Sequence, residues 1–118
     1  MATKSNSLVQ LCAAILADKK AEDLVALDLR GISSFTDYYL ICSATSEPHL
    51  KALVNELRER LWKEKKLHPL AVDGFPQSHW VVAHFGEVVI HLFNAEKRAY
   101  YALEDLWSDA PRVKLKAK

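Results

Sequence analysis

Two segments of the chain repeat apolar residues at the spacing of an α-helix. The first apolar stripe consists of Leu8, Leu11, Cys12, Ile15 and Leu16. It predicts a helix from about Ser7 to Lys20, with Ser7 and Gln10 as a capping box at its start. The second stripe consists of Leu50, Leu53, Val54, Leu57 and Leu61. It predicts a helix over residues 46–66 that Ser46 caps, and Pro48 is tolerated because it falls in the first turn.

Five shorter apolar runs have the length and composition of β-strands. They are Leu24–Leu29, Tyr38–Ala44, Pro69–Gly74, Trp80–Phe85 and Val88–Phe93. Asn94 is placed to cap a final helix that runs to about Trp107. The expected order is α-β-β-α-β-β-β-α, with a parallel crossover from the second strand to the third and an antiparallel hairpin at the end. We therefore predict a single α/β (α+β-like) domain with a mixed five-stranded sheet covered by helices.

The last two strands should form a hairpin with Gly86 and Glu87 as its loop, and its two faces then differ. One face is wholly apolar and is expected to be core: Val81, Ala83, Phe85, Val88, Ile90 and Leu92. The other face mixes large apolar groups with two imidazoles: Trp80, Val82, His84, Val89, His91 and Phe93. This mixed face is suited either to partial cover by a helix or to contact with a partner.

Composition narrows the class of protein. The 118 residues carry a formal net charge of +1, which gives no electrostatic footprint for tight, non-specific nucleic-acid binding. We expect residues 1–110 to form the domain and residues 111–118 to form a short basic tail, mainly solvated. Cys12 and Cys42 form no CxxC pair and are expected to be buried, reduced thiols. Without an apolar segment long enough for a signal peptide or a membrane span, a cytoplasmic protein is expected, with no membrane partner.

Neither a metal site nor an active site is expected. His84 and His91 would be diagonal neighbours, but zinc needs three or four ligands, and Asp73 is only a possible third. The three glycines cannot build a phosphate-binding loop, and no serine sits in a G-x-S-x-G setting. Among the fifteen acidic residues, no two are separated by a single residue, as two-metal phosphoryl chemistry typically requires. The sequence therefore predicts a binding surface with no catalytic residues and no cofactor.

Four stretches together resemble the ribosomal silencing factor family, the Iojap-like proteins. They are Leu24–Ser46, Pro69–Gly74, His79–Phe93 and Arg98–Trp107. The resemblance implies a fold related to nucleotidyltransferases and a partner, ribosomal protein fourteen of the large subunit. Members bound there obstruct subunit joining and lower translation when nutrients are scarce, and organelle relatives act in assembly of the mitochondrial large subunit. The absence of an Arg-rich leader favours the bacterial version.

This chain departs from the family's pattern at a few positions. Many members have an aspartate where His84 stands and a glutamate where Asp73 stands, so an acidic contact is missing at the first position. Ala44 replaces a usual glycine. The active nucleotidyltransferases carry Gly-Ser followed by an Asp-x-Asp pair, whereas the corresponding region here reads Ala44-Thr45-Ser46 without such a pair. A shared fold therefore does not bring the activity with it.

The candidate partner-binding residues lie on the hairpin and on the expected final helix. They are Trp80, Val82, His84, His91, Arg98, Tyr101 and Glu104. Trp80 would be an aromatic anchor, although it could instead cover the end of the core, and Arg98 could instead pair with Glu104. Asp28, Asp37 and Asp73 are interpreted as structural or loop residues, with Asp28 and Asp37 bracing the turn between the first two strands.

The favoured hypothesis is a non-enzymatic translational repressor that binds the large ribosomal subunit. A nucleotidyltransferase-type enzyme with rearranged acids is a second hypothesis, against which the missing acidic pair speaks. A third is an assembly factor that touches ribosomal RNA through the basic tail and the Lys-rich second helix. The sequence leaves monomer and homodimer open.

Overall fold

The computed structural model describes residues 4–31, 36–74, 80–94, 111–113 and 115, and these form two helices and six strands. The elements are α1 (Lys4–Asp18), β1 (Glu22–Asp28), β2 (Tyr38–Ala44), α2 (Glu47–Lys65), β3 (Ala71–Asp73), β4 (Trp80–His84), β5 (Val88–Asn94) and β6 (Arg112–Val113). Asn94, expected to cap a final helix, is the last residue of β5. The rest of that expected helix lies outside the described residues.

The strands form one mixed sheet in the order β3-β4-β5-β2-β1-β6. Among the described strands, β2 and β5 alone pair in parallel, and the other neighbours are antiparallel. The prediction of an α+β domain with a mixed sheet is confirmed, but five was the wrong number of strands. The sixth comes from the segment expected to be a solvated tail, because Val113 pairs with Ala26 and Arg112 pairs with Leu27.

The connection from β2 through α2 to β3 is a parallel crossover, because the two strands run in the same direction. The two strands are not neighbours in the sheet, however. β3 is antiparallel to β4, β4 is antiparallel to β5, and β5 is parallel to β2, so β3 and β2 point the same way. The β4–β5 hairpin lies between them in the sheet. β3 is thereby placed at one edge of the described sheet, next to Trp80–His84.

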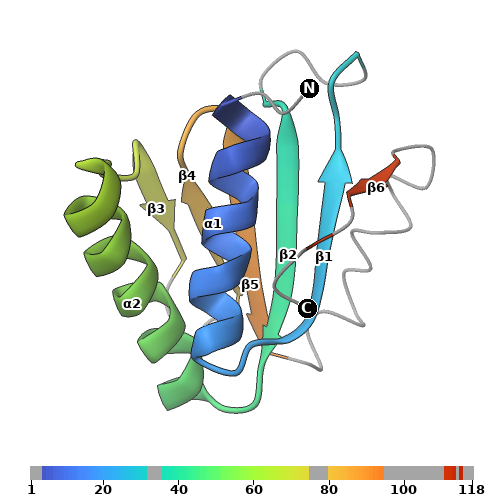
Figure 1. Cartoon of the computed structure of the whole chain (residues 1–118). Helices are drawn as coiled ribbons and strands as arrows, with labels where there is room; N and C mark the ends of the chain where they lie inside the picture. Colours follow the sequence, from blue (N-terminus) through green and yellow to red (C-terminus); the bar gives the residue numbers. More distant parts are fainter. Residues whose placement is uncertain (1–3, 32–35, 75–79, 95–110, 114, 116–118) are drawn as a thin grey trace.

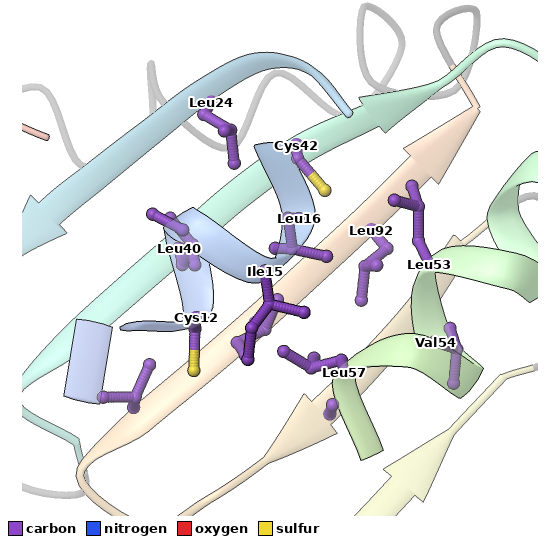
Figure 2. Packing of buried hydrophobic residues seen from close by; sticks show 14 of the residues in the cluster. Cys12, Ile15, Leu16, Leu24, Leu40, Cys42, Leu53, Val54, Leu57 and Leu92 are labelled. Atoms are coloured by element: carbon purple, nitrogen blue, oxygen red, sulfur yellow. The ribbon is translucent and has the colours of Figure 1, made fainter. Parts of the chain in front are cut away.

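Both helices cover the same face of the sheet (Figure 1). Figure 2 shows residues of α1, α2 and the central strands converging in the core between these two layers, among them Leu16, Leu40 and Leu57. Within the described part of the chain, neither helix has the length and apolar character to cross a membrane.

The start of the first helix differs from the prediction. α1 begins at Lys4, so Ser7 lies inside the helix and the predicted capping box is wrong. The buried stripe is also rotated, since Val9 and Ala13 are fully buried whereas Leu8 and Leu11 are only partly so. The capping signal is local, and it does not prevent the helix from continuing towards the N-terminus.

The cap of the second helix is confirmed. The Ser46 hydroxyl accepts a hydrogen bond from the His49 amide at 3.1 Å. His49 then joins the two helices, because its Nε2 lies 2.8 Å from the carbonyl oxygen of Lys19. This contact fixes the start of α2 against the end of α1 on the covered face of the sheet.

Candidate docking surface

The hairpin has the predicted register, with Val82 opposite His91 and His84 opposite Val89. Gly86 adopts a φ of +79°, a conformation that glycine reaches without strain. The face predicted to be core is confirmed: the side chains of Val81, Ala83, Phe85, Val88, Ile90 and Leu92 are at most 6% exposed. All six belong to the cluster that packs under α1 and α2.

The opposite face changes from buried to accessible across the two strands. On β5, the side chains of Val89, His91 and Phe93 are buried. Val89 and Phe93 form a second apolar cluster with residues of β1, β2 and the turn after β1: Leu27, Leu29, Tyr39 and Ile41. On β4, Trp80, Val82 and His84 are only half-buried. Accessible surface therefore increases toward the sheet edge.

His91 supports the indole of Trp80 from within this face. Trp80 Nε1 donates a hydrogen bond to His91 Nδ1 at 3.3 Å, so Nδ1 is an acceptor and carries no proton. Burial, and secondarily the nearby His84, lower the pKa of His91 to about 4. Among the described residues, its Nε2 has no hydrogen-bond partner. His91, predicted as a contact residue, is thus a neutral, buried group that orients Trp80.

Trp80 is also held by stacking on Phe93, with ring centroids 5.3 Å apart and planes 18° apart. The centroid of the His91 ring lies 6.1 Å from that of Trp80, with the planes 26° apart. An aromatic side chain fixed by neighbouring rings and one hydrogen bond loses little conformational freedom on binding. Trp80 is therefore both partly covered by the fold and available at the surface.

The accessible part of this face continues onto β3. Val82 pairs with Asp73 and His84 pairs with Ala71, so these side chains share one face. We call this surface the edge strip: Ala71, Asp73, Trp80, Val82 and His84. Asp73, predicted as a structural or loop residue within the expected strand Pro69–Gly74, lies on β3, and its Oδ2 is 3.2 Å from His84 Nε2. A shallow hollow of about 230 Å³ opens between Asp73, Gly74, Trp80 and Val82.

The edge strip has few groups that could do chemistry. In the part of the chain that the structure describes, no three histidine, cysteine, aspartate or glutamate side chains gather to hold a metal ion. The strip instead combines an aromatic ring, two aliphatic side chains, a carboxylate and an imidazole. Such a combination is typical of a protein-docking surface.

The turn after β1 is stabilised by hydrogen bonds within the turn and by hydrogen bonds to the hairpin loop. The carboxylate of Asp28 accepts three bonds from Arg30, one from the backbone amide and two from the guanidinium, at 2.8–3.0 Å. The side-chain bond from Arg30 is the main cause that lowers the pKa of Asp28. The amide of Asp37 donates to the Glu87 carbonyl at 2.9 Å. Asp28 therefore braces the turn itself, and Asp37 joins the turn to the hairpin loop.

Comparison with known proteins agrees with this fold. Residues 2–118 match the model of the family RsfS, described as "Ribosomal silencing factor during starvation". The chain belongs to this family. The resemblance read from the sequence motifs is therefore confirmed.

Relatives of the chain cover nearly its whole length. It is 41% identical over 111 residues to the ribosomal silencing factor RsfS of Halalkalibacterium halodurans, covering 94% of each chain. The RsfS of Bacillus subtilis is 39% identical over 109 residues, covering 92% of each. A crystal structure of a Bacillus halodurans protein superposes with a TM-score of 0.79 at 40% identity, covering 92% of this chain and 98% of that one.

Two exposed hydrophobic residues were missed by the sequence analysis. Trp62 is 43% exposed and Leu70 is 79% exposed. The ring of Trp62 stacks on His68, with centroids 4.2 Å apart. The signal for Trp62 was available, since it follows Leu61 directly and so falls outside the buried stripe of α2. Arg98, Tyr101 and Glu104, predicted as contact residues of this RsfS-family chain, lie outside the described residues.

Proposed function

We propose that this protein represses translation by binding ribosomal protein fourteen of the large subunit and blocking subunit joining sterically. The observation that carries the proposal is the edge strip, where Trp80, Val82 and His84 are accessible beside the carboxylate of Asp73. Membership of the RsfS family, and relatives named ribosomal silencing factors, support the ribosome as the target. Under this proposal, the protein acts in the cytoplasm.

The geometry of Trp80 supports its role as the anchor. Specific interfaces bury about 800 Å² on each partner, but a few central aromatic residues supply most of the affinity. Trp80 is already oriented by Phe93 and His91 before any partner arrives. The hollow next to it, between Asp73 and Val82, offers room for a side chain of the partner.

Charge indicates what the partner surface should carry. Asp73 has a side chain that is 75% exposed, so its carboxylate remains open to a basic group despite the contact with His84. A lysine or arginine on the ribosomal protein would fit this end of the edge strip. We propose that Arg98, Tyr101 and Glu104 extend the contact.

Steric blocking requires no catalytic group, so we propose no enzymatic activity. The absence of two acidic residues at a spacing of two anywhere in the sequence supports this choice over a nucleotidyltransferase. Thermal unfolding in the presence of nucleoside triphosphate and magnesium tests it. We expect no shift in the midpoint, and a rise of several degrees would favour an enzyme.

Subunit joining can be measured directly by light scattering. Purified large subunits are incubated with the protein and then mixed with small subunits. We expect the scattering increase to be lost in proportion to the large subunits occupied. In the control, the small subunits are incubated with the protein before mixing. This order should give no additional inhibition, because the protein is expected to bind only the large subunit. If occupied large subunits join normally, the blocking mechanism is wrong and a role in large-subunit assembly is favoured.

A further inference from the structure

A second hollow lies on the helix-covered side of the same sheet edge, between α2 and β3. Its volume is about 250 Å³. The floor is apolar and is made by Val54 of α2, Val72 of β3 and Val81 of β4. The rim on the α2 side is polar and consists of Lys51, Asn55 and Arg58, which are all exposed. The side chain of Val72 points to this side, opposite to the edge strip.

The two flanks of α2 differ in how their cations are compensated. On the flank near α1, the guanidinium of Arg60 meets Asp18 at 2.9 Å and Glu64 at 3.5 Å. On the flank near β3, no ion pair to Lys51 or Arg58 occurs within the described residues. The hollow therefore combines an apolar floor with two cations that no described carboxylate neutralises.

The backbone beside the hollow is also open to a partner. β3 is the outermost strand at this end of the described sheet, and its one described neighbour is β4. An edge strand offers unpaired amide and carbonyl groups to an extended segment of another chain. A segment added there would direct alternate side chains into the hollow.

We propose that the free edge of β3 and the hollow beside α2 bind an extended acidic segment of a partner protein. Lys51 and Arg58 are seven residues apart, about 10 Å along the helix axis. Carboxylates at positions i and i+4 of a strand are about 13 Å apart on one face. An aliphatic side chain at position i+2 would then fill the hollow, while the two carboxylates reach Lys51 and Arg58.

The chemistry of the hollow favours polypeptide over RNA. Proteins that bind single-stranded RNA stack its bases on aromatic side chains next to basic residues. The described lining of this hollow contains valines, a glycine and an asparagine besides the two cations, and no aromatic ring. An aliphatic side chain flanked by carboxylates matches both the floor and the rim.

The proposal is tested by NMR with the isotope-labelled full chain and a blocked peptide of sequence Thr-Glu-Thr-Leu-Thr-Glu-Thr. We expect saturable shifts at the amides of residues 71–74 and at Asn55. A matched peptide with glutamine in place of both glutamates should bind about fivefold more weakly or worse, because two ion pairs are lost. The double variant K51E/R58E should weaken binding of the glutamate peptide at least as much, because it adds repulsion between like charges to the loss of both ion pairs.

The double variant K63E/K65E is the matched control. It changes the net charge of α2 equally, at exposed positions that do not line the hollow, and binding should be unchanged. Equal binding of both peptides, shifts confined to other residues, or no shift at millimolar peptide would overturn the proposal. Tighter binding of an oligouridine RNA at the same residues would also overturn the proposal and would favour nucleic acid as the ligand. Concentration-dependent shifts without peptide would instead favour a second copy of this chain.

Discussion

The two faces of the β4–β5 hairpin come from alternating residues of the same strands, yet they are built differently. The face under the helices contains only apolar side chains, and each is almost completely buried. The opposite face changes from buried Phe93 through His91 to half-exposed Trp80. The first face excludes water uniformly, whereas the second supports one aromatic group at an accessible edge.

This difference shows that the two-residue alternation of a strand assigns side chains to the two faces of the sheet but does not determine how exposed they are. On the second face, the side chains of the internal strand β5 are buried, whereas those of β4, next to the edge strand β3, are partly exposed. The specific contact between Trp80 and His91 then determines how the accessible ring is oriented. Four variants or conditions probe the contrast, and they follow in order of decreasing effect.

Truncating the helix-covered face should have the largest effect. Ile90 is fully buried, so Ile90→Ala should lower the free energy of unfolding by about 2–5 kcal/mol. Val82, on the other face, is half-buried, and Val82→Ala should cost about 1 kcal/mol or less. Urea unfolding at neutral pH measures both. Similar losses for the two variants would contradict the contrast between the faces.

Low pH should destabilise the protein because of His91, which lies on the second face. The pKa of His91 is lowered from 6.5 to about 4 in the folded state, so the unfolded chain takes up its proton first. Stability that is fully present above pH 6.5 is therefore lost as the pH falls through about 4, by roughly 3 kcal/mol. His91→Asn keeps an acceptor for the indole but does not titrate. Unfolding free energies measured from pH 7 to 4 should fall less in this variant, and parallel curves would contradict the account.

Trp80→Phe should reveal the hydrogen bond to His91. Phenylalanine keeps a ring over Phe93 but removes the indole N–H, at a cost of about 1 kcal/mol. Because that bond favours neutral His91, its loss should also raise the pKa of His91, as followed by NMR. Trp62→Phe is the control, and the pKa of His91 should not respond to it. An unchanged pKa in Trp80→Phe would show that burial alone determines the titration.

The contact at the accessible edge should contribute least. Asp73→Asn removes the partner of His84, but Asp73 is exposed and His84 is only half-buried, and such accessible pairs contribute about 0.2–1 kcal/mol. The unfolding free energy should change within that range, and the change should shrink as salt is added. A loss above 2 kcal/mol would mean that this edge is structural rather than available for docking.

Much of the fold could be predicted because it depends on local periodicity. The strand Tyr38–Ala44, the Ser46 cap and the hairpin register follow from apolar spacing and short-range hydrogen bonds. The predicted capping box at Ser7 failed although its signal is local, but the missed features of the sheet involve residues far apart in the sequence. Arg112–Val113 become a strand only because β1 offers them an edge, and the place of β3 depends on the hairpin inserting beside β2.

The candidate site was predicted by residue type but not by exposure. Trp80, Val82 and His84 could be assigned to one face by alternation, and they remain accessible. His91 shares that face but is buried, and it lies on the internal strand β5. The alternation of residues does not distinguish these two outcomes, because it assigns all four side chains to the same face.

Retention on purified large ribosomal subunits, measured by co-sedimentation, tests the docking of the edge strip most directly. Trp80→Ala and Val82→Glu should each weaken binding, about 30-fold for the tryptophan if it is the anchor. Trp62→Ala removes the same type of side chain at an exposed position on α2, and this variant should bind as the original chain does. Undiminished binding by folded Trp80→Ala and Val82→Glu variants would contradict the account.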